Sequence, residues 1–158
     1  MANLQKWSPI APAWVDVFGV GASNLNIANF TNGLGIISTT TIVSDGSLYM
    51  DISFQCTSIS PSGVPAITFF LLGLLADGAT FADGDNNTST AANQPTQTAF
   101  LGTIFLRTKA SSAQNQLLRG LLIPPGSYVL YVVNNSGVTL PSTGTVCKAR
   151  LYAETNNG

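Results

Sequence analysis

The stretch LYMDISFQC, residues 48–56, decides the fold class of this chain. Every second residue from Leu48 to Cys56 is apolar, and the residues between them are Tyr49 and three polar side chains. Such a period of two is typical of a β-strand with one face in a core and the other in water, because successive side chains of a strand point to opposite faces. The stretch therefore predicts a half-buried strand.

The same alternation closes the chain, where the apolar residues Cys147, Ala149, Leu151 and Ala153 alternate with Lys148, Arg150, Tyr152 and Glu154. Two further segments, Ala66–Leu75 and Ser127–Val133, are apolar at nearly every position. Strands of that kind are covered on both faces. We expect the cover to be the other sheet, a loop or a partner subunit.

Four more segments are rich in β-branched or aromatic residues or are bounded by Gly, Pro and Asn, which predicts further strands. They are Trp14–Val20, Leu34–Val43, Ala99–Leu106 and Leu117–Ile123. No stretch has a clear helical period, although Ser111–Leu118 is compatible with one helical turn. About eight strands of uneven spacing predict an all-β fold, a jelly-roll or Greek-key β-sandwich. We expect one sandwich domain over residues 14–158, preceded by an extended arm over residues 1–13.

Charge is scarce in this chain of 158 residues, since charged side chains make up 8% of it against a usual share of about 25%. Six basic and seven acidic residues are dispersed, so no patch could release the counterions of a nucleic acid. Sheet edges are commonly protected by charged side chains. Their scarcity predicts edges that are covered by a loop or by another subunit, and hence a homo-oligomer.

The longest apolar run, Ala66–Ala76, has about half the length that a membrane helix needs. The opening stretch MANLQKWSPIAPAW has no apolar core of signal-peptide length. We therefore expect synthesis in the cytoplasm and no membrane contact. The two cysteines, Cys56 and Cys147, fall in predicted strands, and we expect buried free thiols rather than a disulfide.

Groups suited to catalysis are few. The chain has no His, its one Glu is Glu154, and the aspartates Asp16, Asp45 and Asp51 fall on or beside different predicted strands. Proton transfer near neutral pH depends most often on His, and a paired-carboxylate site needs two acids that converge. The sequence therefore predicts a protein that is not an enzyme and that uses no cofactor.

One long polar stretch, Asp77–Thr98, invites two interpretations. Its hard oxygen ligands are of the kind that calcium prefers, but their spacing does not match an EF-hand, so we favour a solvated turn without metal. These ligands are Asp77, Asp83, Asp85, Asn86 and Asn87. The neutral side chains beside Phe81 or Phe100 could also bind a sugar, whereas a mobile loop tip is the simpler interpretation.

The candidate contact residues lie in two places. Tryptophan is frequent at interface hot spots, and proline suits an extended arm because it lacks a backbone donor. The first group, in and beside the arm, is Trp7, Pro9, Ile10, Pro12 and Trp14. The arm either packs on its own sandwich or reaches a neighbour. The second group, Arg107 and Lys109, would meet an acidic partner surface or else end a solvated loop.

Four segments together resemble the small jelly-roll decoration, or cement, proteins on the heads of tailed bacteriophages. They are Leu4–Trp7 with Trp14–Phe18, then Leu118–Gly120, Pro124–Tyr128 and Cys147–Glu154. The resemblance implies a homotrimer that binds the major capsid protein on the capsid exterior of the virion. It implies no catalytic residue. The alternative is a lectin-like host-recognition module of a tail or head fibre, with residues 77–98 touching carbohydrate.

Overall fold

The computed structural model describes residues 4–8, 13–18, 29–47, 49–82, 90–91, 95 and 99–157. Eleven β-strands lie within these residues. They are β1 (Leu4–Ser8), β2 (Val15–Asp16), β3 (Leu34–Ile37), β4 (Ile42–Ser44), β5 (Tyr49–Ile59), β6 (Ala66–Gly73), β7 (Thr90–Ala91), β8 (Phe100–Phe105), β9 (Ser112–Leu122), β10 (Gly126–Asn135) and β11 (Val146–Asn157).

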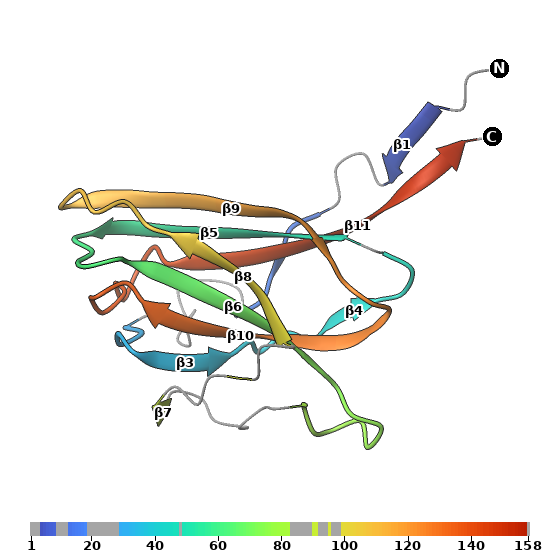
Figure 1. Cartoon of the computed structure of the whole chain (residues 1–158), viewed down its shortest axis with the longest axis horizontal. Coiled ribbons are helices and arrows are strands. Elements are labelled where there is room, and N and C mark those ends of the chain that lie inside the picture. The colour runs from blue at the N-terminus through green and yellow to red at the C-terminus, as the bar shows by residue number, and fades with distance from the viewer. Residues whose placement is uncertain are drawn as a thin grey trace.

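The strands form two antiparallel sheets that face each other (Figure 1). The first sheet has the order β1, β11, β5, β9, and β2 pairs with β11 on the same side as β1. The second sheet has the order β7, β3, β10, β6, β8, and β4 continues the pairing of β3 along β10. The eleven strands therefore fill nine positions, four in the first sheet and five in the second.

The pairing is nested from the ends of the chain inward. Strand β2 pairs with β11, β3 and β4 pair with β10, β5 pairs with β9, and β6 pairs with β8. A long hairpin that is wrapped in this way into two sheets is a jelly roll, so the predicted all-β sandwich is confirmed.

The core lies between the sheets. Met50, Ile52 and Phe54 of β5 are fully buried there, and they pack with Phe69 of β6 and Leu130 of β10. These three β5 residues belong to the apolar set that alternates along residues 48–56. The period of two therefore identified the buried face correctly.

A second apolar cluster covers the outer face of the second sheet. It consists of Phe70 and Leu72 from β6 and Val129, Tyr131 and Val133 from β10. Strands β6 and β10 are thus apolar on both faces, as their sequences predicted. Side chains from the connection between β6 and β8, Phe81 and Ala99, pack against the cluster, so part of its cover is a loop.

The predicted strand Leu34–Val43 is divided by a break at Ser38. The backbone N–H of Ser38 donates to the carbonyl of Leu130 (2.7 Å), but the N–H of Leu130 donates to the Ser38 hydroxyl (3.0 Å). Two residues on, the N–H of Thr40 donates to the carbonyl of Val17 (3.1 Å), beside β2 in the other sheet. The break therefore ties the two sheets together along one edge.

Two local predictions were wrong. Residues 111–118 form no helical turn, because pairing with β5 draws Ser112–Leu122 into one strand and overrides local preference. Of the strand predicted over 14–20, the described residues 14–18 are in a strand only at Val15–Asp16, and residues 19–20 lie outside the described part of the chain. The predicted arm was left open between packing on its own sandwich and reaching a neighbour; within it, the extended segment Leu4–Ser8 pairs with the last residues of β11.

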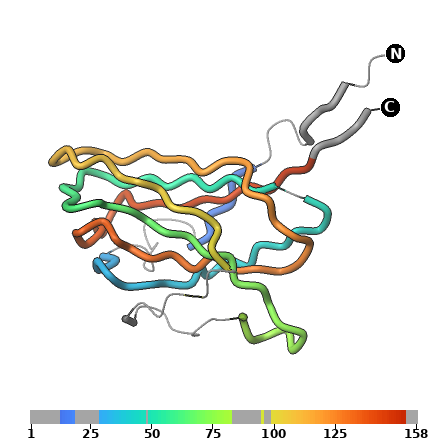
Figure 2. Tube along the Cα trace, in the orientation of Figure 1, coloured from blue at the N-terminus to red at the C-terminus, as the bar shows by residue number. Residues whose placement is uncertain are grey.

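The connections gather at two ends of the sandwich. Residues 60–65, 106–111 and 136–145 lie together at one end, as the chain trace shows (Figure 2). Strand β1 and the final part of β11 lie side by side at the other end (Figure 1).

Candidate interaction surfaces

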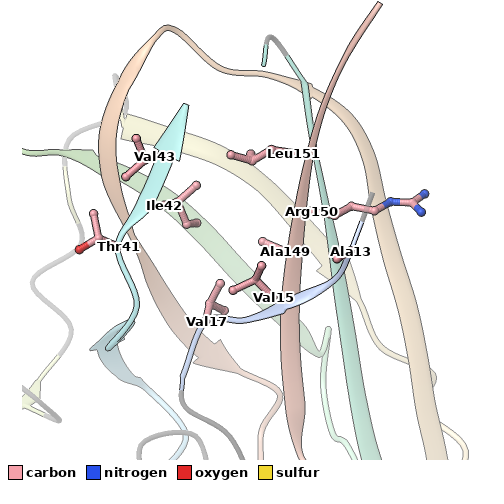
Figure 3. Close-up of a pocket in the computed structure, with 9 residues that line it drawn as sticks. All are labelled: Ala13, Val15, Val17, Thr41, Ile42, Val43, Ala149, Arg150 and Leu151. Atoms are coloured by element: carbon pink, nitrogen blue, oxygen red, sulfur yellow. The ribbon is translucent and has the colours of Figure 1, made fainter. Parts of the chain in front are cut away.

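An apolar hollow of about 280 Å³ opens at the edge formed by β2 and β4 (Figure 3). Its lining comes from β2, β4 and β11 and their flanks: Ala13, Val15, Val17, Thr41, Ile42, Val43, Ala149, Arg150 and Leu151. Val15 and Val43 are 50% and 54% exposed. In Figure 3 the guanidinium group of Arg150 points away from the other lining residues. The hollow therefore offers an apolar, solvent-accessible surface.

The break at Ser38 and the small size of two side chains account for this space. The Thr40 hydroxyl donates to the carbonyl of Asp16 (3.0 Å), so β2 stays next to the chain that enters β4. On the opposite wall, the lining residues Ala13 and Ala149 end at a methyl group. A larger residue at either position would fill part of the hollow.

Beside the hollow, Arg150 joins a polar cluster on the outer face of the first sheet. Its Nε and Nη2 donate to one carboxylate oxygen of Asp51 (2.9 and 2.7 Å), and its guanidinium carbon lies 4.5 Å from the ring centre of Trp14. The other oxygen of Asp51 accepts the hydroxyl of Tyr152 (3.0 Å) and the backbone N–H of Gly120 (2.9 Å). Asp51 is buried, and each of its oxygens has two donors.

The Gly120 donor depends on a β-bulge. The register between β5 and β9 shifts at Asp51, where Arg119 and Gly120 together face this one residue. Gly120 has a φ of 64°, a conformation that favours glycine. The bulge thus directs a backbone N–H toward the carboxylate.

Burial acts to raise the pKa of Asp51, but the hydrogen bonds from Gly120, Arg150 and Tyr152 outweigh it and hold that pKa below its ordinary value. Asp51 is therefore an ionised group with its acceptor positions in use. This arrangement suits a structural anchor and does not suit a general base, which needs a free lone pair.

A second surface lies along β8. Among the described strands β8 pairs only with β6, and its sequence, residues 100–105, carries no charge. Phe105 is 66% exposed and Phe100 is 52% exposed, although the ring of Phe100 also meets that of Phe70 edge-on. The N–H of Leu106 donates to the carbonyl of Pro65 (3.0 Å) and extends the pairing of β8 with β6. The result is an open strand edge with two exposed aromatic rings.

The predicted contact residues Arg107 and Lys109 follow β8 directly, and both are exposed. The buried side chain of Gln114 fixes the backbone at Arg107: its Oε1 accepts the N–H (2.9 Å) and its Nε2 donates to the carbonyl (3.2 Å). In the part of the chain that the structure describes, neither cation forms an ion pair. The backbone of the loop is thus fixed by Gln114, and both cationic side chains are exposed.

The other predicted contact residues have separate outcomes. Trp7 lies in β1, where its partner in register is Glu154 of β11. Pro9, Ile10 and Pro12 lie outside the described residues. Trp14 lies under Arg150 rather than fully exposed, so it packs on its own sandwich.

The structure does not bring the two predicted groups together. Trp14 lies near Asp51 through Arg150, whereas the loop of Arg107 ends at Ser112, which pairs with Ile59. Asp51 and Ile59 are eight residues apart on β5, about 26 Å at a rise of about 3.3 Å per residue. No sequence pattern indicated the hollow, because its walls come from three separate segments.

The remaining candidates are structural. Cys56 and Cys147 are buried free thiols, as predicted, and burial raises the pKa of each. Asp77 caps a turn: its carboxylate accepts the Thr80 hydroxyl and the N–H groups of Ala79 and Thr80, and these bonds lower its pKa to about 2. The described residues contain no cluster of His, Cys, Asp or Glu that could hold a metal.

The other possible calcium ligands of the polar stretch, Asp83, Asp85, Asn86 and Asn87, lie outside the described residues. Within the described ranges there is no helix with the length and apolar character that crossing a membrane requires.

No family model matches the chain, and no curated protein matches it. Its function is therefore inferred from its own residues.

Proposed function

We propose that this chain is a structural virion protein that decorates the outer surface of a bacteriophage head as a homo-oligomer. Its partners are the major capsid protein and further copies of itself, and the proposed oligomer is a homotrimer. The protein binds the head and stabilises it, and it carries out no reaction.

One observation carries the proposal. Three of the segments that resemble decoration proteins are distant in sequence but meet around Asp51. Trp14–Phe18 supplies the ring under Arg150, Leu118–Gly120 supplies the bulge donor, and Cys147–Glu154 supplies Arg150 and Tyr152. Segments that form one cluster support a shared fold better than scattered matches would.

The exposed surface also favours attachment to a protein lattice. Large apolar side chains stay exposed at the ends and edges of the sandwich, with Val64, Leu122 and Phe105 exposed by 81%, 70% and 66%. Exposed apolar patches commonly mark protein interfaces. A neutral surface attaches with little dependence on salt, since only charged contacts are screened. Many identical copies then make weak single contacts sufficient.

The first test is to measure the mass of the purified protein by light scattering and then to sediment it with undecorated heads. We expect an oligomer that sediments with the heads, and we expect the same bound fraction when the salt concentration is raised from about 0.1 to 0.5 M. Heads that are already decorated serve as the control and should take up no more protein. A monomer that stays in the supernatant contradicts the proposal.

A second test removes residues 1–13, to which we assign the grip on the capsid. The truncated protein should keep its fold, because Trp14 and the Asp51 cluster remain, and should lose affinity for heads. Unchanged affinity would contradict this role of the arm. Binding of the full chain to glycans but not to heads would instead support the lectin-like alternative.

A further inference from the structure

The most exposed aromatic side chain in the described residues is Phe105, at the end of the open strand β8. Its ring has no ring partner within the described residues, unlike that of Phe100, which contacts Phe70. Leaving a phenyl ring in water forgoes much of the free energy that its burial provides. Phe105 is therefore a suitable group to enter a pocket on another molecule.

The hollow between β2 and β4 has the size and the chemistry to receive such a ring. Its volume is about 280 Å³, and an apolar protein cavity of about 150 Å³ is enough to bind benzene. Val15, Ile42 and Val43 line it with aliphatic groups, and its mouth is open to solvent. By volume, the hollow is therefore large enough to receive a phenyl ring.

The ring and the hollow lie at opposite edges of the same sandwich. In the second sheet β4 pairs on one side of β10, and β8 lies beyond β6 on the other side. In the first sheet β2 lies on one side of β11, and β9 lies beyond β5 on the other. Phe105 therefore cannot enter the hollow of its own chain.

The charges of the two edges are also complementary. Near Phe105 the exposed cations Arg107 and Lys109 have no ion-pair partner among the described residues. Next to the residues that line the hollow, Lys148 pairs with Asp16 (3.3 Å), and the lining residue Arg150 pairs with Asp51. The exposed carboxylate of Asp45, in the turn after β4, is left without an ion pair in the described part of the chain. Among the described residues, the edge of Phe105 thus carries two cations without an ion pair, and the edge of the hollow carries one such carboxylate.

We propose that copies of this chain associate head to tail, with Phe105 of one copy seated in the β2–β4 hollow of the next. This inference rests on the proposed homo-oligomer and names its interface. A contact between two different surfaces closes into a ring when its rotation allows. Arg107 of the first copy then approaches Asp45 of the second.

Two single variants test the two halves of the contact. Phe105→Ser removes the ring, and Val43→Arg blocks the mouth of the hollow and repels the basic edge. Both positions are more than half exposed, so the fold should persist and the far-UV circular dichroism spectrum should be unchanged. Each variant should raise the dissociation constant for self-association by roughly 10- to 100-fold. Native mass spectrometry and sedimentation equilibrium measure this constant. Leu75→Ser, at an exposed apolar residue in neither surface, is the control and should associate like the wild type.

Mixing the two variants gives the sharpest result. The Val43→Arg copy still presents Phe105, and the Phe105→Ser copy still has an open hollow, so one intact contact can form. We expect a one-to-one dimer that grows no further. An interface in which β8 of one copy pairs with β8 of another gives a different result, because Val43→Arg would then associate normally.

The proposal is overturned if Phe105→Ser associates as tightly as the wild type, or if the mixed variants stay monomeric. Both measurements use the purified protein without heads. The head-binding assay is separate, so a wild type that binds heads but associates through other residues contradicts this interface and leaves the proposed function standing.

Discussion

The two outer faces of the sandwich are stabilised by opposite means. On the first sheet, the buried carboxylate of Asp51 gathers Arg150, Tyr152 and Gly120 around a single charge. On the second sheet, an apolar cluster that includes Phe70 and Tyr131 is spread over two strands and carries no charge. The first face is thus stabilised by contacts to a single buried carboxylate, and the second by apolar packing over two strands.

This difference predicts how each face fails. A buried ion pair contributes little net stability, but the loss of one partner leaves the other charge without compensation. An apolar cluster loses stability in proportion to the volume that is removed from it or forced into it. The stability of the polar face should therefore depend on one residue and on pH. The stability of the apolar face should depend only on how well its side chains pack.

The largest effect is expected for Asp51→Ala. It removes the acceptor of four hydrogen bonds and leaves Arg150 without its partner. We expect a loss of about 3 kcal/mol in the free energy of unfolding, the lower part of the range for a broken buried pair, because Arg150 keeps some contact with water. Urea denaturation followed by tryptophan fluorescence measures this. A loss below about 1 kcal/mol would mean that the face does not depend on this residue.

The corresponding change on the apolar face is Gly35→Ala. A methyl group at Gly35 would overlap the hydroxyl group of Tyr131, so the ring must leave its place in the cluster. We expect a loss of about 1–3 kcal/mol, as for other overpacked sites. The matched control is Gly73→Ala, whose methyl group would meet the ring of Tyr128 at an ordinary 3.7 Å. Equal losses from both variants would contradict the role of Tyr131.

A smaller effect is expected in the pH dependence of stability, which should differ between the two faces. The pKa of Asp51 is lower in the folded chain than in the unfolded chain, so its stabilisation is complete above the unfolded value of about 3.9 and is lost as the pH falls through the folded value. We expect the difference in urea midpoint between the wild type and Asp51→Asn to be constant from pH 7 to about 5 and to shrink below about 4. The difference between the wild type and Gly35→Ala should not change with pH. Other aspartates titrate in all three proteins, so their effects cancel.

The sequence predicted the apolar face better than the polar one. Continuous apolar runs such as Ala66–Leu75 indicate a strand that is covered on both sides, because few other structures accommodate them. In the sequence Asp51 was one polar residue in the alternation of residues 48–56 and one of three dispersed aspartates, with no sign of the partners it gathers. Its partners come from β9 and β11, and no local pattern reports a contact across strands.

The hollow and the exposed ring of Phe105 were missed for a related reason. The predicted strand Ala99–Leu106 contained Phe105, but its sequence does not show that β8 lies at a sheet edge. Edge position follows from topology, and the hollow follows from the break at Ser38, where a hydroxyl replaces a backbone carbonyl in the ladder. Both features depend on which strands become neighbours.

The smallest effect concerns the contact between Trp14 and Arg150, which links the start of the sandwich to the polar face. Trp14→Leu keeps an apolar side chain but removes the ring that lies 4.5 Å from the guanidinium group. We expect a coupling energy of about 0.5–1 kcal/mol in a double-mutant cycle with Arg150→Met, because a cation over a half-buried ring is only partly desolvated. A coupling below about 0.3 kcal/mol would mean that Trp14 is held by packing alone. The polar face would then end at Arg150, and Trp14 would belong with the apolar surface beside the hollow.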